Sequence, residues 1–287
     1  MFEQQSRRFA CVILFPVLLI ASAYAERPDQ ATGPGKIIEV MISAPSLAGN
    51  LLGDPTVQPM SVYLPPGYES SPDKRYPVLY LLHGFKGTNR TWMIDPAILK
   101  DGPLPESPEG RYGHDGKLTS EALDSVIASG TIPELIIVAP NGWNAYKHGY
   151  YVNSVVTGNW EDHIVRDVVK YVDATYRTLA QAASRGLAGH SGGGNGALYI
   201  GMRNPDVFSA VYAMAPCCTG PAFSIPPFTS AESDQLQPFW QNLYTRMSAL
   251  TSKNQLPPAR SSKQDDFWLN EQLATGAAYS PNPDRPP

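Results

Sequence analysis

Apolar residues in the middle of the chain form short continuous runs that are separated by turn signals. Residues 76–82 (YPVLYLL) and 136–139 (IIVA) are almost entirely apolar, and Gly follows each run within three residues. Such runs are typical of strands that are buried on both faces of a parallel sheet. Further strands are expected at 36–43, 60–64, 186–189 and 209–214.

Segments with helical spacing lie between these runs. They occupy 120–129, 160–176 and 193–202, and Asn159 precedes the second of them as a candidate N-cap. Strands that alternate with helices form βαβ units, whose crossovers place helices on both faces of a sheet. The pattern therefore predicts an α/β fold with a mainly parallel central sheet and helices on both faces.

The pattern changes after Pro216. Residues 219–230 are rich in Pro, Ser and Thr, helices are expected at 233–250 and 265–273, and no further buried strand follows. We therefore expect a core at 36–218 and a Pro-rich cap or insertion segment at 219–287. On this interpretation the segment ends in mid-domain, and the last strands of the sheet are missing.

The first 25 residues have the features of a secretory signal peptide. Arg7 and Arg8 precede an apolar run at 9–20, and Ala23-Tyr24-Ala25 follows as a small-x-small cleavage pattern. The apolar run is too short to cross about 30 Å of hydrocarbon. The sequence thus predicts a signal peptide at 1–25, cleavage after Ala25 and a linker at 26–35. The mature protein is then secreted or periplasmic, with no stable membrane span.

Composition excludes some partners. The 287 residues are 43% hydrophobic and 17% charged, with a formal net charge of −4, which is ordinary for a globular protein and gives no basic surface for nucleic acid. Cys217 and Cys218 are expected to be two small buried residues near a strand end, because cysteine is commonly buried. The alternative is a vicinal disulfide, which an oxidising compartment allows but whose geometry is strained. No second cluster of Cys or His accompanies them, so no metal site is predicted.

Gly189-His190-Ser191-Gly192-Gly193 matches the pattern G-x-S-x-G. A strand is predicted before this motif and a helix after it, which is the context of a nucleophile elbow that exposes a serine oxygen on a sharp turn. Ser191 is therefore the candidate catalytic nucleophile. The alternative is a Gly-rich helix start that binds a phosphate.

A second motif, His83-Gly84-Phe85, follows the strand at 76–82. Acyl transfer requires hydrogen-bond donors aimed at the oxyanion that develops in the transition state. The backbone amides of Phe85 and Gly192 are predicted to form this oxyanion hole. His83 itself is expected to support the loop.

These motifs, in combination, resemble those of the esterase family that includes S-formylglutathione hydrolases, feruloyl and other carbohydrate esterases, and mycolyltransferases. The resemblance covers about 60–216 and includes 61–68 (SVYLPPGY), 80–84 (YLLHG), 151–154 (YVNS), 158–162 (GNWED) and 186–198 (GLAGHSGGGNGAL). It implies an α/β-hydrolase fold, ester hydrolysis through an acyl-serine, and no cofactor. By position, Ser191 takes the nucleophile's role, and the amides of Phe85 and Gly192 take the oxyanion role.

The chain departs from this family in one respect, because no histidine follows Ser191. Its five histidines are His83, His114, His148, His163 and His190. Serine needs an adjacent base, and in this fold the order is Ser, then Asp or Glu, then His. The chain is incomplete at its C-terminus, or it is a pseudoenzyme that binds an ester or glycan, or the upstream His148 substitutes. No triad acid can be assigned.

The sequence thus predicts an exported serine esterase that acts on a small-molecule or carbohydrate-linked ester. The alternatives are a non-catalytic protein and an acyltransferase variant of the same site. Trp160, Tyr150 and Tyr151 are expected to shape the substrate pocket, and the alternative for Trp160 is that it packs the start of its helix. The oligomeric state is left open.

Overall fold

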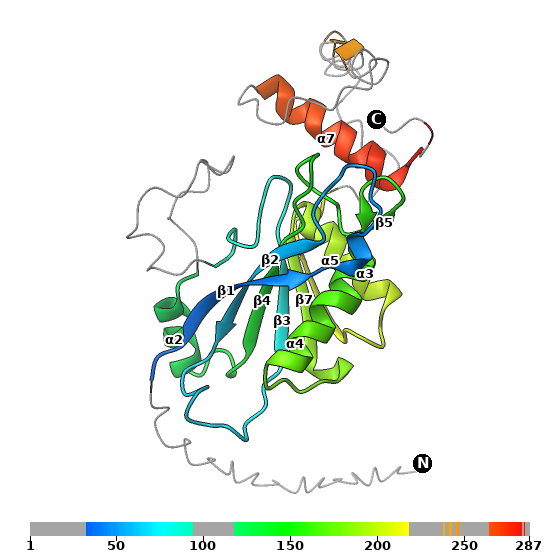
Figure 1. Ribbon diagram of the computed structural model, residues 1–287. Helices are drawn as coiled ribbons and strands as arrows, with labels where there is room; N and C mark the ends of the chain where they lie inside the picture. Colours follow the sequence, from blue (N-terminus) through cyan, green and yellow to red (C-terminus); the bar gives the residue numbers. More distant parts are fainter. Residues whose placement is uncertain are drawn as a thin grey trace, which may run out of the picture. The chain divides into compact units, whose positions relative to one another are not determined.

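The computed structural model describes residues 33–93, 118–217 and 264–282, together with 238, 241–242, 245–246 and 284. Its centre is a six-stranded sheet of order β1-β2-β4-β3-β7-β8 (Figure 1). The strands are β1 (Lys36–Ser43), β2 (Val57–Leu64), β3 (Val78–Leu82), β4 (Ile136–Pro140), β7 (Arg185–His190) and β8 (Ala210–Met214). Each expected strand is present: β1 has its predicted bounds, and the other strands lie within three residues of theirs.

Five of the six strands run in the same direction, and only β2 runs opposite to them. β3 pairs in parallel with β4 and β7, and β7 pairs in parallel with β8, whereas β2 is antiparallel to both β1 and β4. The prediction of a mainly parallel sheet is confirmed, and β2, between β1 and β4, is the one antiparallel strand. The parallel strands all end at one edge, where open α/β sheets bind their ligands.

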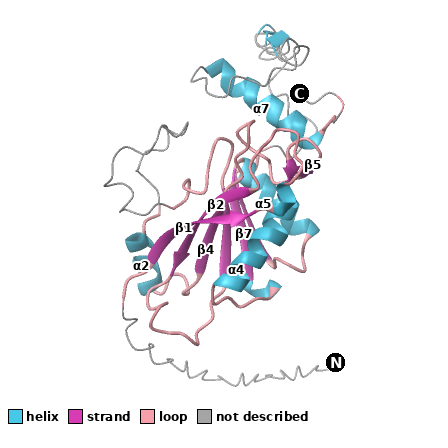
Figure 2. Ribbon diagram, in the orientation of Figure 1, coloured by secondary structure: helices cyan, strands magenta, loops and turns pink. Residues whose placement is uncertain are grey.

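Alternate residues of the strands pack into two separate cores. In β3, Tyr80 and Leu82 belong to one core and Leu81 to the other. The first core receives α4 (Val169–Thr175) and α5 (Gly192–Arg203), and the second receives α2 (Ser120–Ala128). Figures 1 and 2 show α2 on the opposite side of the sheet from α4 and α5. The fold is that of an α/β-hydrolase, as expected.

The helix expected at 160–176 is divided into three parts. A short α3 (Trp160–Asp162) leads through a π-helical turn (His163–Val168) into α4. Asn159 stands at the N-cap position without capping, because Asn153 accepts the hydrogen bond of the Asp162 amide instead (3.1 Å). Asn153 comes from the small hairpin of β5 (Asn153–Ser154) and β6 (Gly158–Asn159).

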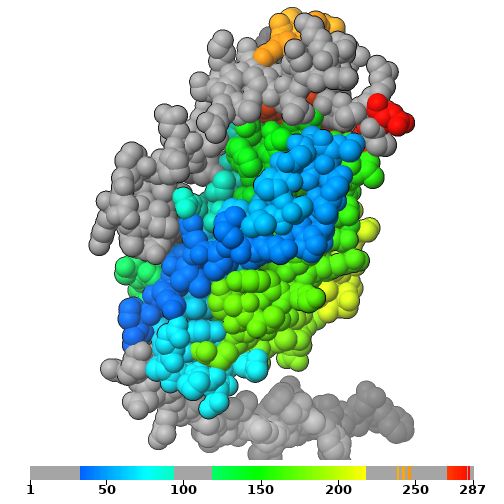
Figure 3. All heavy atoms as spheres, in the orientation of Figure 1, coloured from blue at the N-terminus to red at the C-terminus, as the bar shows by residue number. Residues whose placement is uncertain are grey.

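A short 3-10 turn (Pro45–Leu47) follows β1 and lies against this divided helix. Ala44, Leu47 and Trp160 form a small buried cluster there, and the space-filling view shows the blue segment after β1 in contact with green residues (Figure 3). Trp160 is fully buried, and its indole donates to the Thr157 carbonyl (2.8 Å). Trp160 therefore packs the start of its helix, which was one of the two alternatives for it.

The last described helix is α7 (Gln264–Tyr279), which extends the expected helix at 265–273. The expected helix at 233–250 falls mostly outside the described residues, as do the predicted signal peptide and most of the linker. The division at 218 therefore stays a prediction. In the described part of the chain, no helix is both long and apolar enough to cross a membrane.

Burial in the sheet gives a direct test of the fold. Leu187 in β7 is almost fully buried in the first core, whereas Leu179 is 37% exposed. Replacing a buried leucine by alanine removes apolar contacts and leaves a cavity, which costs about 2–5 kcal/mol. We expect Leu187→Ala to lower the free energy of unfolding by that amount in urea denaturation. Leu179→Ala is the matched control, and an equal effect of the two substitutions would contradict the fold.

Candidate active site

Ser191 lies between the end of β7 and the first residue of α5, with φ 54° and ψ −119°. A serine rarely adopts this conformation, which costs on the order of 1–3 kcal/mol and must be held by its surroundings. Its amide donates to the Met214 carbonyl (3.0 Å), and its carbonyl accepts from the amides of Asn195 (3.0 Å) and Cys217 (3.2 Å). Its side chain does not cap α5 and is partly exposed. The structure thus places Ser191 at the tight bend that its motif predicts.

The motif glycines are required by close backbone contacts. A Cβ atom at Gly189 would lie 2.2 Å from the Gly193 carbonyl oxygen, and one at Gly193 would lie 2.2 Å from the Leu82 oxygen and 2.5 Å from the His83 oxygen. No side chain fits at such distances. The absence of side chains lets α5 begin directly against the end of β3.

Because of this contact, we expect alanine substitutions at two glycines to differ strongly in their effect on the free energy of unfolding. Gly193→Ala must displace backbone, so we expect it to cost about 1–3 kcal/mol or more of unfolding free energy. Gly276 lies within α7 with open space around the position of its Cβ, so Gly276→Ala is expected to be neutral or to stabilise by up to about 1 kcal/mol. Urea denaturation of both variants tests this, and a Gly193→Ala protein as stable as Gly276→Ala would refute the contact.

The loop after β3 passes directly beside Ser191. A Cβ atom at Gly84 would lie 3.2 Å from the Ser191 Cβ and 3.7 Å from its Oγ. The Gly84 carbonyl accepts a hydrogen bond from His83 Nδ1 (2.8 Å). Because the peptide bond is trans, the Phe85 N–H points away from that carbonyl, and so away from the His83 ring.

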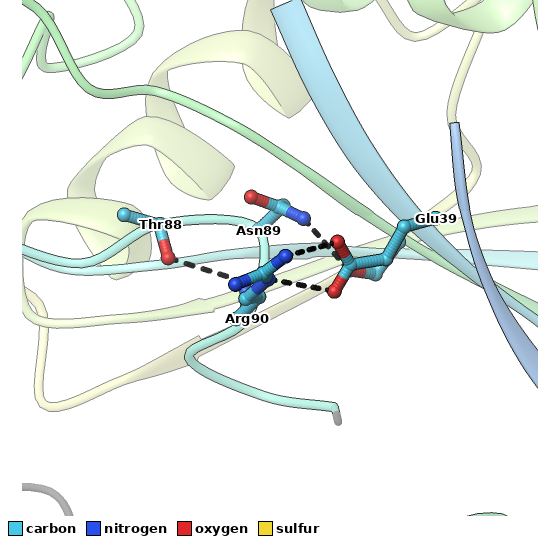
Figure 4. Close-up of polar contacts among 5 residues, drawn as sticks. Glu39, Thr88, Asn89 and Arg90 are labelled. Carbon is cyan, nitrogen blue, oxygen red and sulfur yellow. Dashed lines mark hydrogen bonds and ion pairs between the residues drawn. The ribbon is translucent and has the colours of Figure 1, made fainter. Parts of the chain in front are cut away.

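The far end of the same loop is tied to the first two strands (Figure 4). Arg90 makes a bidentate ion pair with Glu39 of β1, with both N–O distances at 2.7 Å, and its amide donates to the Thr88 hydroxyl (3.2 Å). Asn89 donates to the Ser61 hydroxyl of β2 (2.9 Å). A planar, bidentate pair fixes orientation as well as distance. The loop that contains Phe85 is therefore held at its start by the His83 ring and at its far end by Asn89 and Arg90.

His83 and His148 are fully buried, and backbone groups occupy both ring nitrogens of each. His83 Nε2 accepts from the Gly142 amide (2.7 Å), and His148 Nδ1 accepts from the Tyr150 amide (3.2 Å) while its Nε2 donates to the His83 carbonyl (3.2 Å). This geometry disfavours His148 as a relocated base, because its acceptor nitrogen is already engaged. His163 pairs with Asp167 (3.3 Å) inside the π-helical turn.

His190 is exposed, and His114 lies outside the described residues. Within the described segments, no side chain hydrogen-bonds the Ser191 hydroxyl. The described residues also include no cluster of three or more His, Cys, Asp or Glu that could hold a metal ion.

The sequence-based expectation for the cysteines is wrong for Cys217, which is only partly buried and is disulfide-bonded.

Burial keeps both histidines uncharged. It lowers the pKa of His83 from 6.5 to about 4, partly offset by the hydrogen bond to Gly84, and it lowers the pKa of His148 well below its ordinary value. Desolvation is the main cause in both cases, since a charge buried without a counter-ion is unfavourable. Neither ring is protonated at neutral pH.

This depression makes stability depend on pH. Unfolding frees His83 to take up a proton that the folded ring does not bind, so its contribution is fully present above pH 6.5 and is lost as the pH falls toward 4. A shift of this size corresponds to roughly 3 kcal/mol. We expect the free energy of unfolding, measured in urea, to fall across this range in the wild type and to fall less steeply in His83→Asn. Equal slopes would argue against the buried neutral ring.

Backbone strain is concentrated around Ser191. In the described part of the chain, every non-glycine residue with positive φ lies in a segment that follows one of the strands β3, β4, β7 and β8. They are Lys86, Lys147, Tyr150, Tyr151, Ser191 and Ala215. Strained residues of this kind gather at active sites and ligand-binding loops. Apart from Ser191, whose motif predicts a sharp turn, no signal in the sequence reveals these residues, because none is a glycine.

Aromatic side chains and α7 form one wall beside this region. The Tyr150 ring stacks with Phe85 (centroids 6.4 Å apart) and contacts Tyr279 at the end of α7 (5.8 Å). Asn195, one turn into α5, donates to the Tyr279 hydroxyl, and Ser154 donates to the Ala277 carbonyl (2.6 Å). These contacts with α7 join residues far apart in the chain, and no local signal in the sequence predicts them.

Residues 55–278 match the family described as "Putative esterase". The fold is that of the α/β-hydrolases, and the chain belongs to this esterase family. A solved ferulic acid esterase is similar in structure, with a TM-score of 0.50 and 28% sequence identity over 66% of this chain and 62% of that chain.

Curated relatives include an endo-1,4-beta-xylanase/feruloyl esterase of Xylanibacter ruminicola, 28% identical over 53% of this chain, and an S-formylglutathione hydrolase of Arabidopsis thaliana, 27% identical over 54%. The matched stretches span only 18% and 50% of those two proteins.

Proposed function

We propose that this protein hydrolyses carboxylic esters through an acyl intermediate on Ser191. The observation that supports this most strongly is the strained turn of Ser191 at the carboxyl edge of the parallel strands, where no side chain among the described residues hydrogen-bonds its hydroxyl. A serine on such a turn presents its oxygen to a ligand at that edge. Membership of the esterase family supports the same reaction class.

In the proposed reaction, Ser191 Oγ attacks the ester carbonyl carbon and loses its proton to a base. The amides of Phe85 and Gly192 bind the oxyanion of the tetrahedral intermediate. The alcohol then leaves with the proton, and water attacks the acyl-serine to release the acid. No residue in the described segments is positioned as the base, so the proposal assigns that role to a group outside them. No cofactor takes part.

The proposed substrate is a small-molecule or carbohydrate-linked ester. Relatives named as feruloyl and ferulic acid esterases support this class, and the partly exposed ring of Phe85, stacked on the buried Tyr150, offers a surface for a planar acyl group. An acyltransferase variant uses the same acyl-serine with an alcohol in place of water.

Ser191→Ala tests this proposal directly. With the full-length protein and p-nitrophenyl acetate, we expect the substitution to lower kcat by at least about 10³-fold, because it removes the nucleophile. Ser209→Ala, at an exposed serine just before β8, is the control and keeps wild-type turnover. Turnover that survives in Ser191→Ala would end the proposal.

A non-catalytic ligand-binding protein is the second candidate function. It is favoured by one observation: backbone groups occupy both ring nitrogens of His83 and of His148, the buried histidines nearest to this region. A fluorophosphonate probe separates the two candidates. Covalent labelling at Ser191 supports the esterase, whereas ester binding with neither labelling nor turnover supports the binding protein.

We also propose that the protein is exported with cleavage after Ala25, on the basis of the N-terminal sequence alone. N-terminal sequencing of protein recovered from the periplasm or the medium tests this. A first residue of Glu26 is expected, and an intact N-terminus on the exported protein would contradict cleavage there.

A further inference from the structure

His148 is in contact with both halves of the proposed oxyanion hole. It follows β4 in the chain, its side chain is fully buried, and its own amide is held by the Asn144 side chain (3.1 Å). One edge of its ring faces the His83 carbonyl, and the other faces the start of α5. A Cβ atom at Gly192 would lie 2.9 Å from His148 Cε1.

The hydrogen bonds of the ring define its tautomer. The Tyr150 amide can only donate, so His148 Nδ1 must be the acceptor in the 3.2 Å contact between them. The proton of the neutral ring therefore lies on Nε2, which donates to the His83 carbonyl (3.2 Å). The Tyr151 hydroxyl donates to the same carbonyl (3.1 Å).

Two successive carbonyls are thereby turned into the protein interior. The His83 carbonyl is held by His148 and Tyr151, and the Gly84 carbonyl is held by the His83 ring. In a trans peptide the N–H group lies opposite the carbonyl. The amides of Gly84 and Phe85 therefore face away from the buried histidines, in a loop that passes Ser191 at van der Waals distance.

We propose that His148 is a positioning residue. It fixes the His83–Gly84 peptide through the His83 carbonyl, so that the next peptide, which carries the Phe85 amide, starts from a fixed position, and it sets the spacing of this loop from the Gly192 amide by packing against Gly192. This inference rests on the proposed function, because it concerns the two amides assigned there to the oxyanion. His148 touches no substrate and transfers no proton. Its neutral, fully buried ring acts as a hydrogen-bond donor of fixed direction toward the His83 carbonyl.

Two substitutions separate the hydrogen bond from the packing. His148→Leu keeps apolar volume but loses the donor, and His148→Gln retains an N–H near the position of Nε2. With p-nitrophenyl acetate and the full-length protein, we expect His148→Leu to lower kcat by about 10²-fold with KM changed less than about threefold, because the oxyanion contact forms only in the transition state. His148→Gln is expected to recover most of this loss.

His163→Leu is the matched control, because His163 is equally buried but pairs with Asp167 inside the π-helical turn. We expect it to lower thermal stability without lowering kcat of the folded protein. If His148→Leu does not fold, His148→Asn takes its place, since its shorter amide does not reach the His83 carbonyl.

A second measurement does not depend on turnover. In ¹H–¹⁵N NMR spectra of the full-length protein, we expect the His148 ring to show its proton on Nε2, and His148→Leu to shift the amide resonances of Phe85 and Gly192. His163→Leu leaves those resonances in place. Unshifted amides in His148→Leu, with or without a loss of kcat, would overturn the positioning role. Absence of Ser191-dependent turnover would instead overturn the proposed function, and the NMR result then decides the positioning role by itself.

Discussion

Helix α5 begins so close to the end of β3 that it cannot bear a side chain at the point of contact, and the position of Ser191 depends on this constraint. The Cα of Gly193 packs against the carbonyls of Leu82 and His83, and that of Gly189 packs against Gly193 itself. The chain must turn sharply between β7 and α5, which forces Ser191 to φ 54°. Hydrogen bonds from β8 and from α5 hold the strained turn, so its cost is met by the surrounding sheet.

The contact between α5 and the end of β3 also places the loop after β3 next to Ser191. The buried histidines His83 and His148 lie behind this loop. His83 and His148 lie in a region from which water is excluded, so both are neutral and each ring has one donor and one acceptor nitrogen. Backbone groups of two loops, those after β3 and β4, satisfy all four nitrogens. The arrangement fixes the direction of backbone amides before any ligand arrives, which is the property that stabilises a developing oxyanion.

The central strands and the turn at Ser191 could be predicted from the sequence, because their signals are local. The apolar runs at 76–82 and 136–139 gave the central strands, and G-x-S-x-G between a strand and a helix gave the turn at Ser191. The division of the helix at 160–176 was not predicted, because the π-helical turn depends on a hairpin that supplies its cap from Asn153.

The site was predicted less completely than the fold. His148 was expected to be a loop residue or a relocated base, and nothing in its sequence neighbours indicates that Tyr150 and His83 would engage its two nitrogens. The positive φ angles of Tyr150 and Tyr151, and the contacts of α7 with Asn195 and Ser154, arise from packing between distant segments. Such contacts depend on tertiary structure and leave no local pattern in the chain.

The central claim is that two backbone amides face the oxygen that forms on a substrate attached to Ser191. A crystal structure of the full-length protein after reaction with an alkyl fluorophosphonate measures this directly. The account predicts a phosphonyl group on Ser191 Oγ, with one of its oxygens within hydrogen-bond distance, roughly 2.7–3.2 Å, of both the Phe85 and the Gly192 nitrogens. An adduct whose oxygens all point away from these two amides, or a Ser191 hydroxyl that stays unmodified, would contradict it.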